Sequence, residues 1–296
     1  MDKFPSRERS TSATLNWRVS AVVVVANVRP TAAGRTSLDL CLRSAMAEPW
    51  IDDLVVVDHG NVPEISSILR GVQADRRDVR LITAPRGATS AAAANLGAEA
   101  ARGRWLLFLD PDVVLQRGSV ARMAAAGGGA RTPWIVGGKL TDTQGRERAA
   151  ARVGALNSFS ALAVAMEWRG PKPKRKGAKA PAKVAAVSSA FMLVPRGDFE
   201  ALGRFDEGFA TDAADLDLCR RAADAGGSVL FQPAASGVQF ERGPRDGRRQ
   251  AQGLALFAAK SAKTLPEKAF AAIARPALMA LLGLKDFVCG RPPIRR

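Results

Sequence analysis

Apolar and polar positions follow one another along the first third of the chain in blocks of strand and helix length. A β-branched run covers residues 19–28, and further apolar runs cover 51–57, 79–84 and 105–109. The helices expected between these runs lie at 37–47, at 65–73 and, with small side chains on one face, at 91–101. Strands that alternate with helices at this spacing predict βαβ units and a mostly parallel sheet.

The second half of the chain continues the pattern less regularly. Further apolar runs predict strands at 134–140, 184–194 and 228–231. Further helices are expected at 117–126, where three glycines end the helix, and from about Asp215 onward. Residues 149–166 are rich in alanine and give no clear prediction.

Composition divides the chain into three parts. We expect a flexible arm over 1–17, one α/β domain over 18–250 and a C-terminal helical extension over 251–296, whose two helices separate near Pro266 or Pro276. Residues 169–183 hold seven basic residues, three prolines and no acid, which predicts a basic mobile loop within the domain.

The strand at 105–109 ends on two carboxylates, Asp110 and Asp112, with Pro111 between them. Ligands of open α/β sheets gather outside the carboxyl ends of the strands, and proline makes the backbone turn there. Two hard oxygen ligands on a tight turn suit Mg²⁺ or Mn²⁺ held together with substrate phosphates. The alternative is an acidic turn that only ends the strand.

Three sequence motifs together resemble glycosyltransferase family 2. The first is the Asp110-Pro111-Asp112 turn after Leu-Leu-Phe-Leu, preceded by a helix with the pattern Arg-Gly…Asn-Leu-Gly…Ala-Arg-Gly. Residues 203–209 resemble the family's Gly-Gly-Phe-Asp-Glu-x-Phe element, and 211–221 resemble its Glu-Asp-x-Asp-Leu-x-x-Arg element. The resemblance covers about 19–240 and is closest to bacterial, rhamnosyltransferase-like members. It implies a GT-A fold, which is a mostly parallel nucleotide-binding sheet with helices on both faces.

The resemblance implies inverting transfer of a sugar from a nucleoside diphosphate sugar to a hydroxyl of a glycan or a lipid-linked acceptor. Asp112 would be the main metal ligand, and Asp110 would hold the nucleotide or a metal-bound water. Asp215 matches the family's catalytic base, with Asp217 as second choice. The residues expected on the acceptor or diphosphate side are Asp206, Gln239 and Arg242.

The nucleotide is expected at the ends of the first strands. The resemblance assigns nucleotide contacts to Ala26, Asn27, Asp58 and Arg86, in addition to Asp110. A carboxylate such as that of Asp58 can accept the imide N–H of uracil or thymine, which favours UDP or dTDP donors over GDP donors.

Four residues depart from the family pattern: Ala214 replaces the Glu of Glu-Asp, Arg204 replaces the second glycine, Ser189 replaces a glycine and Gln239 replaces a histidine. The carboxylates at positions 110, 112 and 215 are all retained. The alternative function is therefore that of a catalytically impaired relative that binds a sugar nucleotide or a partner protein.

Charge narrows the choice of partners. The chain has 44 basic and 28 acidic residues, a net charge of +16, and such a protein attracts polyanions. The absence of tyrosine and of any nucleic-acid motif argues against specific nucleic-acid binding. Phosphorylated substrates and anionic lipid remain as candidate partners.

The remaining signals concern the compartment. Three cysteines without paired spacing predict reduced thiols in the cytoplasm, and a single histidine, His59, excludes a histidine-based metal site. We see no secretory signal and no membrane-spanning run. The basic loop and the apolar segment 269–288 favour a peripheral position on the inner face of the cytoplasmic membrane, although 269–288 is equally compatible with ordinary packing. The high content of alanine, arginine and glycine suggests a bacterial role in cell-envelope polysaccharide synthesis.

Overall fold

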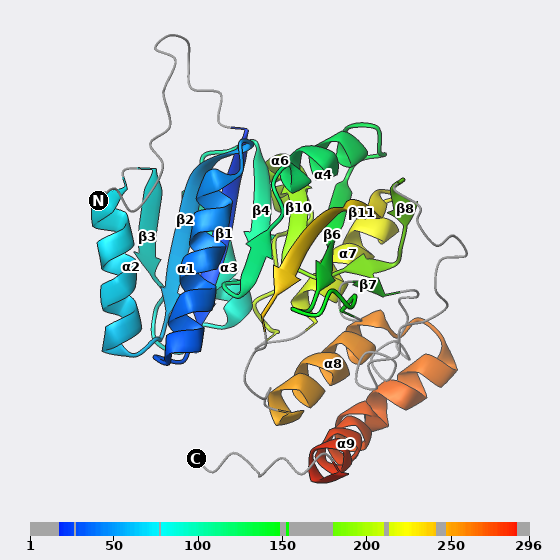
Figure 1. The fold of residues 1–296 in the computed structure, drawn as a ribbon. Helices are drawn as coiled ribbons and strands as arrows, with labels where there is room; N and C mark the ends of the chain where they lie inside the picture. Colours follow the sequence, from blue (N-terminus) through cyan, green and yellow to red (C-terminus); the bar gives the residue numbers. More distant parts are fainter. Residues whose placement is uncertain are drawn as a thin grey trace.

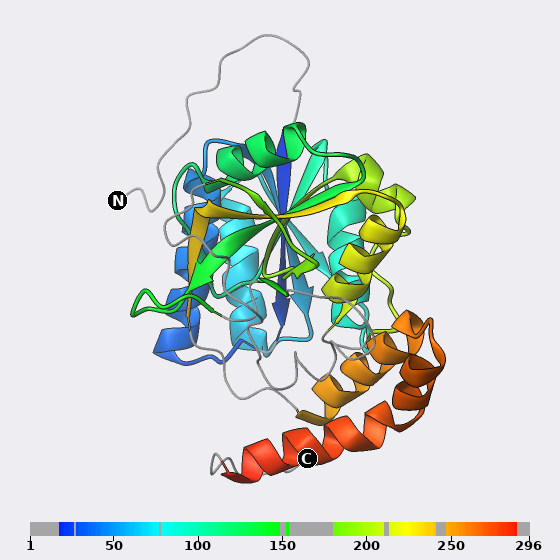
Figure 2. The same cartoon turned by 90° about the vertical axis from the view of Figure 1, so that its right-hand side faces the viewer.

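The computed structural model describes residues 18–26, 28–76, 78–148, 152–153, 180–209, 213–240 and 247–288. The described residues build a nine-stranded, mostly parallel sheet with helices on both faces, and two further helices lie at one end of it (Figure 1). Viewed along the sheet, α1 (Ala32–Ala47) covers one face, and α3 (Ser90–Ala100) and α7 (Ala214–Asp224) cover the other (Figure 2). The expected fold class is confirmed.

The amino-terminal half is a run of parallel strands joined by helices. Its elements are β1 (Val19–Ala26), α1, β2 (Ile51–His59), α2 (Pro63–Asp75), β3 (Val79–Thr83), α3 and β4 (Trp105–Leu109). The valine-rich strand β1 pairs in parallel with both β2 and β4. Both faces of β1 are buried, which explains its continuous apolar run.

The second half of the sheet is mixed. Its elements are β5 (Val113–Leu115), α4 (Ser119–Gly128), β6 (Trp134–Thr141), β7 (Arg152–Val153), β8 (Ala182–Lys183), β9 (Ala186–Val187), β10 (Phe191–Pro195), α6 (Arg196–Ala201), α7 and β11 (Ser228–Gln239). The strand order is β3-β2-β1-β4-β10-β6-β11-β5, with β8 paired to β11, and β7 and β9 form a separate pair. Strand β10 runs antiparallel to both of its neighbours, β4 and β6.

Two sequence expectations in this half were wrong. The apolar run 184–194 is not one strand, because a turn at 188–190 separates β9 from β10. Helix α4 does not end before Gly127 but runs through Gly128. A side chain at Gly127 would place its Cβ 2.4 Å from Trp134, so this glycine serves close packing and does not break the helix.

Other boundaries moved outward. Helix α1 starts at Ala32, where Ser37 was expected, because the Thr31 hydroxyl accepts the Gly34 N–H at 3.2 Å and caps the helix. Strand β11 continues past the expected end at residue 231 as far as Gln239. The expected arm at 1–17 and most of the basic loop at 169–183 lie outside the described residues, as does most of 149–166.

A buried polar network closes the amino ends of the first strands. Asp53 is 2% exposed and accepts hydrogen bonds from Ser20 at 2.5 Å and from Arg80 at 2.6 and 2.7 Å. The Arg102 N–H also donates to Asp53, and the Gly103 N–H donates to the Ser20 hydroxyl. The network joins β1, β2 and β3 to the end of α3.

The C-terminal extension is a pair of packed helices, α8 (Gly247–Ser261) and α9 (Leu265–Val288). The break between them lies at 262–264, so Pro266 falls in the first turn of α9 and Pro276 lies inside that helix. Among the helices in the described part of the chain, none is both long and apolar enough to cross a membrane.

Glu48 is a buried carboxylate at the end of α1. It is 1% exposed, and its side chain accepts the Gly118 N–H at 2.7 Å, which connects α1 to the start of α4. Burial raises the pKa of Glu48 above its ordinary value, although the hydrogen bond from Gly118 opposes this effect. The folded protein therefore holds the proton of this carboxyl more tightly than the unfolded chain does.

We expect Glu48→Gln to remove a pH-dependent contribution to stability. As pH falls through the raised pKa, the folded protein takes up the proton first, so the free energy of unfolding of the wild type rises. The free energy of unfolding of Glu48→Gln, relative to that of wild type, should be highest above this pKa and should fall progressively below it. Urea unfolding across the weakly acidic to neutral range measures this difference. Glu200→Gln, at an exposed carboxylate, is the control, and a difference independent of pH would contradict the prediction.

Candidate active site

The turn between β4 and β5 places the first candidate carboxylates at the carboxyl end of the sheet. The Asp110 N–H donates to Ala190 O at 3.0 Å, and the Val113 N–H donates to Asp110 O at 3.1 Å. The Cys41 thiol on α1 donates to the same Asp110 carbonyl at 3.3 Å. The backbone of Asp110 is thus fixed by three elements, while its side chain lines a pocket.

Asp112 lies deeper than Asp110 and is 6% exposed. The pairing of β5 with β11 sets Gln239 opposite Val113, and the Phe240 N–H donates to Asp112 O at 2.9 Å. The Gln239 amide donates to Asp112 Oδ1 at 3.4 Å. The structure therefore brings the predicted residues Asp112 and Gln239 together.

Arg148 extends this arrangement and was missed by the sequence analysis. It follows the hairpin after β6, and its Nη2 donates to Gln239 O at 3.1 Å. Its Nε is buried and meets no hydrogen-bond acceptor among the described residues. The Arg148 guanidinium thus contacts Gln239, which in turn contacts Asp112. The third residue predicted for this side, Arg242, lies outside the described residues.

The 188–190 turn connects the two predicted catalytic segments. Ala190 O accepts the Asp110 N–H, while the Ser189 N–H donates to Asp215 Oδ2 at 3.1 Å. The Leu216 N–H donates to the other oxygen of Asp215 at 2.9 Å. Asp110 and Asp215 are 105 residues apart in the chain but meet neighbouring residues of one short turn.

A pocket opens between these segments. Small side chains on α3, Ala91 and Ala94, leave space above β1 and β4, and Ala214 faces the pocket at the position where the family pattern has a glutamate. The residues that line it are Val22, Val24, Ser90, Ala91, Ala94, Phe108, Leu109, Asp110, Ser189, Phe205 and Ala214. Its lining is mostly apolar with a few polar residues, Ser90, Asp110 and Ser189, as ligand sites commonly have.

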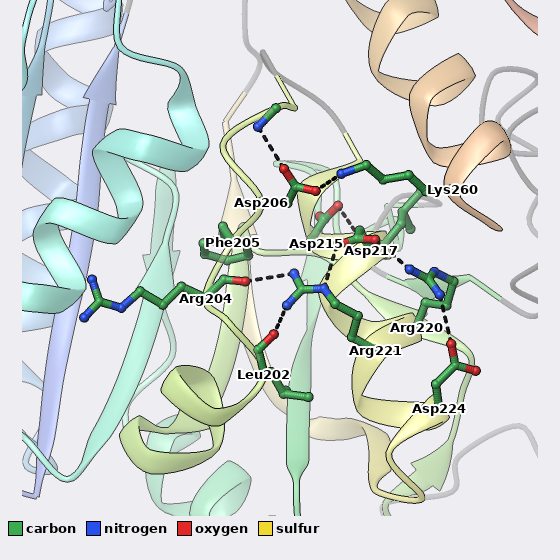
Figure 3. Close-up of polar contacts among 12 residues, drawn as sticks. Leu202, Arg204, Phe205, Asp206, Asp215, Asp217, Arg220, Arg221, Asp224 and Lys260 are labelled. Atoms are coloured by element: carbon green, nitrogen blue, oxygen red, sulfur yellow. Dashed lines mark hydrogen bonds and ion pairs between the residues drawn. The ribbon is translucent and has the colours of Figure 1, made fainter.

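Asp217 has surroundings quite different from those of Asp215. It is 2% exposed, and its oxygens accept from Arg220 at 3.0 Å and from Arg221 at 2.7 Å (Figure 3). Arg221 also donates to Leu202 O, and to Arg204 O at 2.8 Å. Because arginines engage both of its oxygens, Asp217 positions Arg221 and the loop beyond it. We therefore keep Asp215 as the candidate base.

The loop at 202–209 is held in a strained form beside the pocket. Gly203 and Arg204 have φ of +81° and +62°, and the second value is unusual for a residue with a side chain. This conformation explains the second glycine of the family pattern. At position 204 the left-handed conformation costs about 1–2 kcal/mol, and the Arg204 side chain extends away from Arg221 (Figure 3).

Asn95 and Lys260 hold the same loop from two other helices. The Asn95 amide donates to Phe205 O at 2.9 Å and accepts the Phe205 N–H at 3.1 Å. The predicted site residue Asp206 accepts hydrogen bonds from Lys260 on α8 and from the Gly208 N–H (Figure 3). The hydrogen bond from Lys260 lowers the pKa of Asp206. Neither Asn95 nor Lys260 was assigned a role from sequence.

The predicted nucleotide residues lie at the ends of β1 and β2. Ala26 ends β1, and Asn27 lies outside the described residues. Asp58 is 6% exposed and accepts from the Asn61 amide at 2.7 Å, while Asn61 also donates to Val25 O at 2.6 Å. Asn61 thus fixes the Asp58 carboxylate against β1, a role that the polar run after β2 indicated only weakly.

The loop before α3 carries Arg86, which is exposed. His59 at the end of β2 donates through Nε2 to Ala88 O at 2.7 Å. The single histidine therefore connects β2 to the Arg86 loop, a structural role that the sequence did not indicate.

The donor atoms fit a hard divalent cation only in part. The described residues contain no group of three or more His, Cys, Asp and Glu side chains that would form a complete cation cage. Asp110 and Asp112 would supply two carboxylates, which matches the way Mg²⁺ is bound by one or two carboxylates together with substrate phosphates and water.

Fold and site together define an α/β domain of the GT-A type. Residues 18–275 match the model of the family described as "Glycosyltransferase like family 2", and the chain belongs to this family. No curated protein sequence matches the chain.

Two solved structures illustrate the likeness in fold. GalNAc-T7 with UDP, GalNAc and Mn²⁺ has 16% identity and a TM-score of 0.62, with 93% of this chain and 58% of that chain covered. The 1–349 segment of TarS from S. aureus with UDP-GlcNAc has 13% identity and a TM-score of 0.53, with 92% and 73% covered. The chain thus spans little more than half of the GalNAc-T7 chain.

The surroundings of Asp217 predict a stability role that mutation can separate from catalysis. Asp217→Asn should leave Arg221 without its carboxylate and Arg220 with Asp224 alone, and breaking a buried pair costs about 3–5 kcal/mol. Asp224→Asn, at an exposed carboxylate that pairs with Arg220 and Lys263, is the control and should cost less than about 1 kcal/mol. Urea unfolding measures both, and an unchanged stability of Asp217→Asn would return this residue to the list of candidate bases.

Proposed function

We propose that this protein transfers a sugar, with inversion, from a nucleoside diphosphate sugar to a hydroxyl of a glycan or lipid-linked acceptor. The observation that carries the proposal is the attachment of Asp110 and Asp215 to the same 188–190 turn beside one pocket. One carboxylate then faces the diphosphate and the other faces the acceptor, which is the arrangement that a direct displacement needs.

The donor would span the carboxyl ends of β1, β2 and β4. Asp58, held by Asn61, would accept the imide N–H of uracil or thymine, with Ala26, Asn27 and Arg86 close to the nucleotide. UDP donors are supported by the UDP and UDP-GlcNAc bound in the two similar structures. The thymine base of a dTDP donor would offer the same imide N–H to the Asp58 carboxylate.

The diphosphate would lie against the 110–112 turn. Asp110 and Asp112 would hold Mg²⁺ or Mn²⁺, which when bound neutralises the charge of the leaving diphosphate. Arg148, beside Gln239, adds a fixed positive charge from the protein itself. Arg242 and Asp206 remain candidates for the acceptor or diphosphate side.

Asp215 would act as the general base. As the acceptor oxygen bonds to the anomeric carbon, the bond from that carbon to the phosphate oxygen breaks, and the hydroxyl proton passes to Asp215. The N–H groups of Ser189 and Leu216 orient its two oxygens, so the carboxylate is positioned before the acceptor binds. The diphosphate leaves on the opposite side of the sugar.

The setting that we propose is bacterial cell-envelope polysaccharide synthesis, on the basis of composition alone. A second candidate function rests on Ala214, which faces the pocket where the family pattern has a carboxylate. In that case the chain would bind the sugar nucleotide or a partner protein without turnover. Measured transfer from a panel of UDP-, dTDP- and GDP-sugars distinguishes the two functions.

Asp112→Asn should abolish metal-dependent nucleotide binding while the protein stays folded. A ligand at a hundred times its Kd stabilises the native state by about 2.7 kcal/mol, so UDP with Mn²⁺ should raise the Tm of wild type and leave that of the variant unchanged. Asp39→Asn, an exposed aspartate on α1, should behave as wild type. A metal-dependent Tm rise in Asp112→Asn would show that the metal is held elsewhere.

Asp215→Asn should separate donor binding from turnover. The amide keeps the size of the side chain but accepts no proton, so transfer should fall by about a hundredfold or more, the scale of general base catalysis. Its Tm rise with UDP-sugar and Mn²⁺ should match that of wild type. Near-normal turnover would exclude Asp215 as the base.

A further inference from the structure

Helix α9 presents an apolar face to solvent. Leu265 is 83% exposed and Ile273 is 60% exposed, and these are the two most exposed large apolar side chains among the described residues. At 3.6 residues per turn, Leu265, Ala269 and Ile273 lie on one side of the helix together with Pro276 and Ala280. We call these five residues the α9 stripe.

The opposite side of α9 is already used in packing. Ala274 and Leu278 are fully buried, and Phe270 packs beside them against the core. Helix α8 packs against α9. The α9 stripe is therefore additional apolar surface, beyond what the helix needs to fold onto the domain.

The charges around the stripe all have one sign. Lys268 and Arg275 are seven residues apart, both exposed, and lie along one edge of the stripe. Glu267, the single acid at positions 265–280, turns back to accept the N–H groups of Lys263 and Thr264 at 2.9 Å each. It forms a capping box with Thr264 and faces away from the stripe.

We infer that the α9 stripe, with Lys268 and Arg275 along its edge, is a docking surface for an anionic lipid bilayer. An apolar helix face with basic residues at its border lies in the plane of a membrane interface, with its apolar side among the acyl chains. Each basic residue near an anionic surface adds attraction. A net charge of +16 opposes the approach of a second copy of the chain and favours a polyanionic surface.

The position of α9 gives this docking a direction. Figure 1 shows α8 and α9 below the half of the sheet that holds β6 and β11, and both views place them at the end toward which β1 and β2 point (Figures 1 and 2). This end carries the candidate active site. Lys260 on α8 joins Asp206 of the 202–209 loop. A bilayer under the α9 stripe would therefore lie on the active-site side, where a lipid-linked acceptor is presented. This last step rests on the proposed function, whereas the docking itself does not.

Vesicle sedimentation tests the inference with the full chain. The vesicles contain equal parts of phosphatidylglycerol and phosphatidylcholine, or phosphatidylcholine alone. Wild type should bind the anionic vesicles, and rising salt should weaken this binding without abolishing it, because apolar burial is not screened. The double variant Leu265→Glu, Ile273→Glu should lose at least about tenfold in affinity for these vesicles, since it places two charges in the apolar face.

The control variant is Leu40→Glu, Val62→Glu, which makes the same charge change at exposed apolar residues elsewhere. It should bind as wild type does. Wild type that ignores anionic vesicles at low salt, or an α9 variant that binds as well as wild type, would overturn the inference. So would a dimer in sedimentation velocity that the α9 variant dissociates, because the stripe would then join two copies. Transfer to a water-soluble acceptor is measured separately, so failure of docking and failure of sugar transfer are distinguishable.

Discussion

The antiparallel pairing of β10 with β4 is the constraint on which the candidate site depends. Phe191 pairs with Leu109, so the turn that precedes β10 is carried to the end of β4. There it accepts the Asp110 N–H at Ala190 and donates to Asp215 from Ser189. Strand β10 is thus reversed between the parallel strands β4 and β6. The turn at its start holds the backbone of Asp110 and the carboxylate of Asp215.

Carboxylates serve two different purposes in this fold. Asp53 and Asp217 are paired with arginines, and these arginines also hold backbone carbonyls: Arg80 that of Ala100, and Arg221 those of Leu202 and Arg204. Such pairs fix chain segments, because breaking them leaves a buried charge without compensation. Asp215 is only partly buried, and the N–H groups of Ser189 and Leu216 orient it. This difference in surroundings separates a positioning carboxylate from a candidate base.

Local patterns predicted the parallel half of the fold well, because the strands there are continuous apolar runs. Strand β4 was predicted to the residue. The 188–190 turn was not predicted, because the run 184–194 contains no glycine or proline. The turn is imposed by the pairing of β10 with a strand about 80 residues earlier. The hydrogen bonds of Asn95 to the Phe205 backbone were missed for the same reason, because Phe205 is 110 residues away in the chain.

Other parts of the site were open to local reasoning. Asp215 and Asp217 are two positions apart on α7, so their side chains leave the helix about 200° apart and cannot share one role. Helix geometry alone therefore separates the carboxylate held by the 188–190 turn from the one held by arginines. The hydrogen bonds of Arg148 and Asn61 could not be found in this way, since each joins segments that only the folded sheet brings together.

The 202–209 loop shows that helix α8 of the C-terminal extension belongs to the site. A left-handed Arg204 costs about 1–2 kcal/mol, and such strain persists only where the surroundings over-determine the backbone. Three elements do so here: α3 through Asn95, α7 through Arg221 and α8 through Lys260. A neutral hydrogen bond contributes about 0.5–1.5 kcal/mol and a charge-assisted one about 1.5–3 kcal/mol, so together they exceed the cost. Because Phe205 of this loop lines the pocket, the shape of the pocket depends on α8, which lies largely beyond the expected domain end at residue 250 but within the family match to residue 275.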